Sequence, residues 1–393
     1  MGQTPLVDQV RQRDAWSMAT VLERVRGLEV ARRLAASDDD VVAFQAGVRV
    51  LGLTASDPRM TRLHASIADA PRARALLSRR VADGTIPLGP YQKFQGPHWT
   101  LVCLTLIDYP PGDRGLQPIM DQVHRWLLAP ELLRPPRTTR YPDQPDRVRR
   151  CASQEGNVIW SAVRLGLDDD RTLALVERLI AWQWPDGGWN CDKRREARTS
   201  SFQETAIPAR GLYAFGRRHG HLRALQAADR ATELLLARRL LWRRHDGALV
   251  RPDWGGAVDR IHYPIQFYDV LFVLQVMAEL GRLDDPRCAD AVALLVSKQL
   301  PDGGFPLEAR VGTTRSVVAS RGTFADWGPA GVTHGNPLVT VAALGALRAA
   351  DLSREGGQDL SSKGSTGRRP PQGAADPVIA CRPLSRRRGR IEA

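Results

Sequence analysis

The sequence predicts an all-α fold, an (α/α) toroid of repeated helical hairpins, and two observations support this prediction. A turn occurs twice, as Gln-Trp-Pro-Asp-Gly-Gly-Trp from Gln183 to Trp189 and as Gln-Leu-Pro-Asp-Gly-Gly-Phe from Gln299 to Phe305. Apolar runs also alternate with amphipathic ones, and no period-two strand pattern interrupts them. Self-similarity at a spacing of tens of residues is the sequence signature of stacked helical units.

The paired turns have the residue types that end one helix and redirect the chain. Proline fixes φ, aspartate caps its own backbone, and glycine adopts positive φ without a steric cost. We expect Trp189 and Phe305 to fold back onto the preceding helix, and Gln183 and Gln299 to bond backbone groups freed at its end. The turns therefore predict connections between outer and inner helices.

The first elements are predicted from caps and apolar periodicity. Residues 1–40 read as an N-terminal helical segment, whose acidic end at Ser37 to Asp40 is typical of a helix start. A helix over 41–51 is expected to end at Gly52. This helix opens the predicted toroid domain, which spans 41–352.

Five later helices are predicted to be buried, because each combines a polar head with a largely apolar run. Amphipathic helices between them, over 171–182 and 286–298, are predicted to lie outside, the second with Asp285 as its cap and Pro286 at its first position. The polar heads would then meet at one end of an inner ring. They begin at His98, Ser153, Ser201, His262 and Thr333.

The C-terminal residues 353–393 are rich in Gly, Ser, Pro and Arg, and we expect a disordered basic tail there. The whole chain has a net charge of +13, but its arginines are spread over many helices and no nucleic-acid motif is recognisable. We therefore expect no nucleic-acid partner, and the sequence leaves a protein partner open.

Cellular location is predicted from what the sequence lacks. It has no apolar run of about 18 residues for a transmembrane helix and no apolar signal region near Met1. Its 5 cysteines are scattered and odd in number, which favours reduced thiols over a disulfide framework. These features together predict a cytoplasmic protein.

The paired turns resemble the QW repeat, Gln-x-x-x-Gly-x-Trp/Phe, of the terpene cyclase/prenyltransferase superfamily, which includes squalene–hopene and oxidosqualene cyclases. The resemblance covers about residues 40–350 and implies an (α/α) barrel with a central cavity for an isoprenoid or other apolar small molecule. The motif is structural and carries no chemistry itself. Protonating cyclases also have an Asp-x-Asp-Asp acid, which this chain lacks: its acidic runs at 38–40 and 168–170 do not fit, and the second is predicted to cap a helix.

Zinc is the cofactor that the resemblance suggests, because the prenyltransferase β subunits hold zinc with Asp, Cys and His. Here Cys191 and Asp192 follow the first paired turn, Cys151 precedes a predicted inner helix, and His262 heads another. These four residues are the candidate metal ligands. Thiolate, carboxylate and imidazole groups are the ligands that zinc prefers.

A metal-free chemistry at the same rim is the alternative. Glu155, Glu204 and Asp269 are candidate acids or bases beside His262 and His334. For each carboxylate taken singly, a structural ion pair with arginine is the competing interpretation. Two other functions remain open at this stage, a non-catalytic toroid used for binding and a carbohydrate-active (α/α) barrel enzyme.

Overall fold

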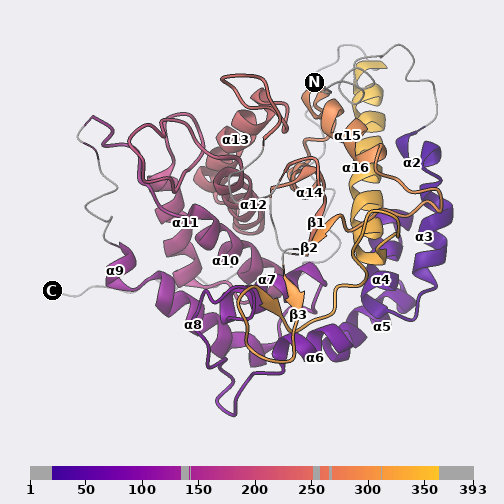
Figure 1. Ribbon diagram of the computed structural model, residues 1–393, viewed down its shortest axis with the longest axis horizontal. Coiled ribbons are helices and arrows are strands. Elements are labelled where there is room, and N and C mark those ends of the chain that lie inside the picture. Colours follow the sequence, from indigo (N-terminus) through magenta and orange to yellow (C-terminus); the bar gives the residue numbers. More distant parts are fainter. Residues whose placement is uncertain are drawn as a thin grey trace.

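The computed structural model describes residues 20–133, 141, 143–250, 257–264, 268–310 and 312–362, and it is mostly helical (Figure 1). The all-α class is therefore confirmed. The strands are two residues long and form two parallel pairs, β1 with β2 and β3 with β4. Their bounds are β1 His262–Tyr263, β2 Ala309–Arg310, β3 Thr313–Thr314 and β4 Gly322–Thr323.

Helices follow one another through most of the described chain. None of those described is both long enough and apolar enough to cross a membrane. In chain order they are α2 Val21–Arg24, α3 Gly27–Ala35, α4 Asp40–Gln45, η1 Ala46–Leu51, α5 Pro58–Ser66, η2 Ile67–Asp69, α6 Pro71–Leu77, α7 Pro97–Leu106, η3 Arg114–Leu116, α8 Gln117–Leu127, α9 Pro130–Leu133, α10 Ala152–Leu165, α11 Asp170–Trp182, α12 Phe202–His219, α13 Leu222–Ala237, α14 Val270–Glu279, η5 Pro286–Cys288, α15 Ala289–Val296 and α16 Pro337–Ser362.

Buried and half-exposed helices alternate along the chain, as the sequence predicts. Every residue of α7 is buried, whereas α11 buries only the stripe Thr172, Leu175, Val176 and Leu179. A helix that is apolar on all sides needs neighbours all round, while an amphipathic one needs them on one face only. The buried helices pack in sequence order, α7 on α10, α10 on α12, α12 on α14 and α14 on α16.

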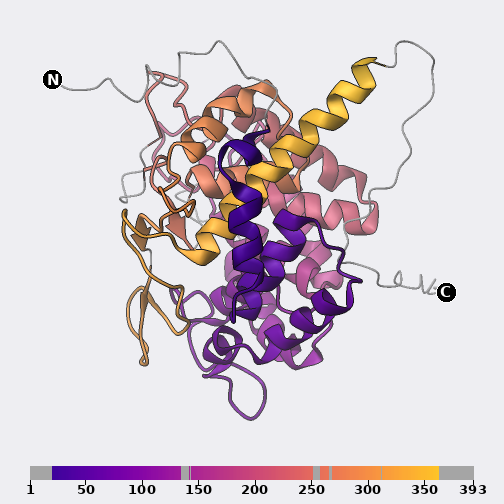
Figure 2. The same cartoon turned by 90° about the vertical axis from the view of Figure 1, so that its right-hand side faces the viewer.

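The two ends of the described chain lie side by side. Helix α16 packs against α2, α3, α4 and η1, and Figure 2 shows it in yellow beside the indigo N-terminal helices. The carboxylate of Asp351 accepts hydrogen bonds from the backbone N–H groups of Val21 and Leu22, both at 2.9 Å. A buried carboxylate at the first turn of a helix satisfies N–H groups that have no partner within it.

The paired turns have the predicted local structure. Trp189 is 1% exposed and its indole N–H donates to the Leu179 carbonyl at 2.9 Å, so the aromatic ring does fold back onto α11. Gln183 donates to the carbonyl of Gly187 at 2.7 Å and to that of Ala227 in α13 at 2.8 Å. The second turn repeats this arrangement, because Gln299 donates to the carbonyls of Gly303 and Val25 at 3.0 and 2.6 Å.

Most acidic helix starts act as predicted. The side chain of Asp39 accepts N–H bonds at the start of α4, Asp169 does so for α11, and Asp285 does so for η5, which leads into α15. The run 168–170 is therefore a helix cap, as the sequence predicts.

Two predicted helix heads are wrong. His262 lies in β1, and α14 begins later, at Val270, because the side chain of Asp269 provides the cap by accepting from Phe272 N–H at 2.8 Å. Pro264 favours extended backbone in the residue before it, which is incompatible with a helix there. Likewise α16 begins at Pro337, where the side chain of Asn336 accepts from Val339 N–H.

The boundary predicted at residue 352 falls inside α16, which continues to Ser362. Once a packed helix is nucleated, each further residue adds one hydrogen bond, and the next proline in the sequence is Pro370. The rest of the predicted tail, 363–393, lies outside the described residues, as does 1–19 of the predicted N-terminal segment.

Candidate metal centre

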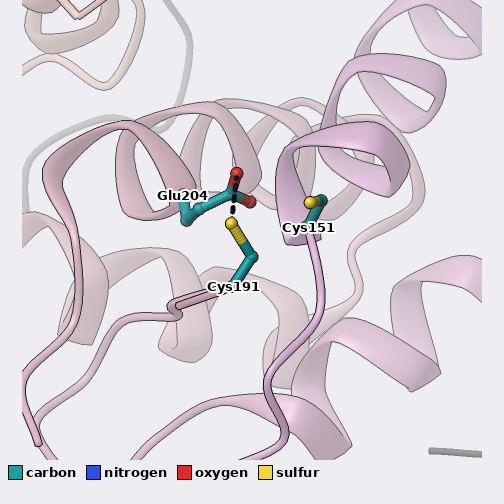
Figure 3. Close-up of side chains that lie close together, drawn as sticks. All are labelled: Cys151, Cys191 and Glu204. Carbon is teal, nitrogen blue, oxygen red and sulfur yellow. Dashed lines mark hydrogen bonds between the residues drawn. The ribbon is translucent and has the colours of Figure 1, made fainter. Parts of the chain in front are cut away.

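Cys151, Cys191 and Glu204 come together at the N-terminal ends of α10 and α12 (Figure 3). One ligand atom from each, two sulfurs and a carboxylate oxygen, lie within 4.8 Å of one another. Two of these residues were candidate metal ligands, and the third, Glu204, was a candidate acid or base. The structure therefore places residues from the zinc hypothesis and from the metal-free hypothesis in one group.

Local backbone structure explains how the two cysteines meet. Arg149 and Asn190 form an isolated parallel β-bridge, and the Arg149 guanidinium donates to the Asp192 carbonyl at 2.8 Å. Cys191 directly follows Asn190, and Cys151 lies two residues after Arg149, both in irregular backbone beside the bridge. The first paired turn ends at Trp189 and therefore leads directly into Asn190 and Cys191.

Glu204 lies in the first turn of α12, where Ser201 is the cap. Both its oxygens are held from α10, because the Ser153 backbone N–H donates to Oε2 at 2.8 Å and the Ser153 hydroxyl donates to Oε1 at 3.0 Å. Burial is the main cause that raises the pKa of Glu204, and the Ser153 hydrogen bonds oppose it. Ser153 thus fixes the carboxylate against the two thiols.

The Cys191 thiol donates to Glu204 Oε1 at 3.7 Å. Its pKa is raised well above the usual range, first by the hydrogen bond with Cys151, then by burial and by the negative charge of Glu204. Two thiolates and a carboxylate repel one another at this distance. A divalent cation bound among them would offset this repulsion and favour the ionised forms, since it stabilises all three negative charges.

Asp192, a candidate metal ligand, points elsewhere. Its carboxylate forms an ion pair with the neighbouring Arg194, with a shortest distance of 2.7 Å, and that pairing lowers the pKa of Asp192. Among the described residues, the group that could hold a metal does not include it.

His262 and Asp269 lie together, at a distance of 3.5 Å between His262 Nδ1 and Asp269 Oδ2, and not with the cysteines. Asp269 is fully buried and caps α14, so its immediate role is structural. Burial raises its pKa, while hydrogen bonds from His262 and Phe272 oppose the rise. His334 lies apart as well, in an exposed loop, where its Nδ1 contacts the Thr333 hydroxyl at 2.9 Å.

Glu155 faces the outer helix α11. Its Oε1 pairs with Arg178 Nη2 at 2.9 Å, and both side chains are less than a tenth exposed. Burial raises the pKa of Glu155 to about 7, although the Arg178 charge acts against the rise. The ion pair considered as the competing interpretation for this carboxylate is therefore present.

Tyr91 is a neighbour of the metal group that the sequence analysis missed. Burial raises its pKa, as do the negative charges of Glu204, Cys151 and Cys191, which places the phenol within electrostatic range of all three. Its ring packs against those of His98, Trp99 and Trp126, with centroids 5.0 to 5.5 Å apart. The sequence does contain a signal for Tyr91, because it lies in a segment rich in aromatics seven residues before the predicted helix head at His98.

An aromatic cluster packs against Tyr91. It consists of the buried side chains of Phe94, Trp99, Val102, Leu106 and Trp160, and it is separate from the main core. These side chains come from the segment before α7, from α7 and from α10. The cluster is therefore an apolar region shared by α7 and α10, with Tyr91 at its edge.

Comparison of the chain with protein-family models and with curated proteins finds no match. The function is therefore inferred from the site and from the packing of the helices.

Proposed function

We propose that this protein is an (α/α) toroid similar to the terpene cyclases and prenyltransferases, with a zinc site at Cys151, Cys191 and Glu204. It would bind or convert an isoprenoid or other apolar ligand inside the ring. The observation that carries the proposal is the convergence of two thiols and one carboxylate within 4.8 Å at the ends of two buried helices. Free thiols there suit a reducing compartment such as the cytoplasm.

Ring closure is supported by the equivalence of the two paired turns. Gln183 bonds Ala227 in α13, the next half-exposed helix, while Gln299 bonds Val25 in the N-terminal segment. A Cβ on Gly187 would meet Arg230 of α13, and one on Gly303 would meet Val30 of α3. The contacts that the second turn makes with Val25 and α3 thus match those that the first turn makes with α13, and this match supports closure of the ring.

The donor set fits zinc. Structural and catalytic zinc sites use thiolate, imidazole and carboxylate ligands in tetrahedral geometry, and a sulfur and a carboxylate oxygen on one zinc lie roughly 3.6 Å apart. The distance of 3.7 Å between Cys191 Sγ and Glu204 Oε1 is close to this value. Three protein ligands leave a fourth position for an external ligand.

Zinc at this site would act as a Lewis acid and would keep a bound thiol or water deprotonated near neutral pH. The protein's own residues position the reactants around it. Ser153 orients Glu204 through two hydrogen bonds, and Glu204 in turn accepts from Cys191. The aromatic cluster next to Tyr91 would exclude water from one side and provide contact area for an apolar ligand.

Metal binding tests the proposal directly. Wild-type protein purified with zinc should contain close to one zinc per chain, and cobalt-substituted protein should show thiolate-to-metal charge-transfer absorption. Cys151→Ser, Cys191→Ser and Glu204→Gln should each weaken the affinity at least about 10-fold, since even changes outside the ligand set cost 10–100-fold. Asp192→Asn is the matched control and should bind as wild type, because that side chain bonds Arg194.

Wild-type protein without zinc, or a ligand set that includes Asp192, would contradict the metal site. The apolar ligand has a separate test, in which an isoprenoid alcohol should quench the fluorescence of Trp99 and Trp160. Replacing either tryptophan by phenylalanine should reduce that change. An unchanged signal at saturating alcohol would argue instead for the non-catalytic alternative.

A further inference from the structure

The two cysteines of the metal group are also neighbours suited to a covalent bond. The bridge between Arg149 and Asn190 brings together the irregular segments that contain Cys151 and Cys191. Their two sulfurs lie within 4.8 Å of each other, so side-chain rotation and a small backbone shift can bring them to the S–S bond length of about 2.05 Å. Cys191 lies in an irregular segment between the paired turn and α12, so its backbone has few regular hydrogen bonds to break.

The other described cysteines differ in accessibility. Cys103 and Cys288 are each 1% exposed, so an oxidant in solution has little access to either sulfur. Cys151 and Cys191 are half-buried and face each other. Oxidation requires access of the oxidant to sulfur, so selectivity for this pair follows from burial.

We propose that, without a bound metal, Cys151 and Cys191 form a reversible disulfide on exposure to a hydroperoxide. The group formed with Glu204 is then a redox modification site. The disulfide does not require the proposed zinc site, but the protection by zinc described below rests on it.

The reaction balances with hydrogen peroxide as the oxidant. Glu204 takes the proton of the Cys191 thiol, the sulfur attacks one peroxide oxygen, and the O–O bond breaks to give a sulfenic acid. The hydroxide that leaves takes the proton back from Glu204 and becomes water. The Cys151 sulfur then attacks the Cys191 sulfur, the S–S bond forms, and the S–O bond breaks. The thiol proton of Cys151 leaves with the hydroxyl as a second water.

Disulfide and metal exclude each other at this site. An S–S bond of about 2.05 Å brings together two sulfurs that tetrahedral zinc would hold roughly 3.8 Å apart, and it removes both thiolates. Oxidation would therefore release the metal, and zinc would protect the thiols.

The test uses the full-length protein after removal of metal with a chelator. Treatment with hydrogen peroxide, thiol blocking and peptide mapping by mass spectrometry should show a Cys151–Cys191 cross-link, with Cys103 and Cys288 blocked as free thiols. Dithiothreitol should restore both thiols. Cys191→Ser should give no cross-link, and Cys288→Ser should give the wild-type cross-link as the matched control.

Irreversible sulfinic acid at either cysteine, or cross-links distributed among all cysteines, would overturn the proposal. Circular dichroism of the oxidised protein distinguishes a native cross-link from one formed after unfolding, which would also overturn it. Preloading with zinc should slow the formation of the cross-link at least about 10-fold, because both sulfurs would be bound to the metal and would not be free to react with peroxide. A cross-link that forms equally fast with zinc present would support the disulfide and contradict the metal site.

Discussion

At the scale of single residues, burial decides what each candidate side chain does. Glu155 and Glu204 lie in the first turns of adjacent buried helices, yet one pairs with Arg178 and the other with Cys191 and Ser153. Both carboxyls have raised pKa values because a low-dielectric interior disfavours their charge. Only Glu204 has neighbours that could share a metal.

The pH dependence of stability should show the effect of Glu155. Its pKa is about 7 in the folded protein and 4.5 as the ordinary value, so the unfolded state releases this proton more readily. The associated stabilisation is complete below the ordinary pKa and is lost as pH rises to about 7, by roughly 3 kcal/mol. Urea unfolding from pH 4 to 8 should therefore give a steeper fall for wild type than for Glu155→Gln.

Glu155→Gln also deprives Arg178 of its carboxylate, which lowers stability at every pH, so the slope and not the absolute value is the readout. Glu196→Gln is the control, because Glu196 is exposed. Equal slopes for wild type and Glu155→Gln would show that Glu155 ionises normally.

Gly188 in the first paired turn is restricted by close packing. A Cβ there would lie 2.4 Å from Thr205 Oγ1 and 2.7 Å from Ser200 Cβ. We expect Gly188→Ala to lower the free energy of unfolding by about 1–3 kcal/mol, as overpacking in a core does. Gly89→Ala, where a Cβ meets nothing within 4 Å, should stay within about 0.5 kcal/mol of wild type in chemical denaturation.

At the scale of helices and turns, the sequence predicts a helix start correctly where the capping side chain lies next to the helix that it caps. Asp169 and Asp285 cap the helices that follow them, as their positions predict. His262 was misassigned because a competing cap, Asp269, lies seven residues further on. A polar residue before an apolar run predicts a helix start, but it does not determine which of two such residues is used.

The glutamine of the paired turn should stabilise the junction between α11 and α13. Gln183→Ala removes hydrogen bonds to the Gly187 and Ala227 carbonyls and leaves these acceptors without that donor. We expect a loss of about 1–3 kcal/mol in the free energy of unfolding. Gln226→Ala on α13 is the matched control, since Gln226 is exposed; a similar loss there would contradict a specific role for Gln183.

At the scale of the whole molecule, the N-terminal helices and α16 hold the two ends of the described chain together. Asp351 bonds Val21 and Leu22 across more than three hundred residues of sequence, and Gln299 bonds Val25. Contacts this distant in sequence are formed against a large loop-closure entropy, so they depend on the intervening helices being in place. The described part of the N-terminal segment, residues 20–40, is therefore packed into the helical body.

Removing the Asp351 carboxylate should loosen the N-terminal helices selectively. Asp351→Ala leaves two backbone N–H groups without their acceptor, each worth about 1–3 kcal/mol. Hydrogen exchange should become faster in residues 21–35 than in α10 and α12, and Tm should fall. Leu352→Ala changes an exposed neighbour and should leave exchange unaltered. Uniformly faster exchange would indicate global destabilisation instead.

The sequence by itself determined the helical class, the caps at Asp169 and Asp285, and the two glutamine turns, because each depends on interactions within a few residues. It also singled out Cys151, Cys191 and Glu204, but as members of different hypotheses. Only the tertiary structure decided that these three meet while Asp192, His262 and His334 lie elsewhere. The reason is physical: their convergence depends on the packing of α10 against α12 and on the Arg149–Asn190 bridge, contacts between residues about forty to fifty positions apart.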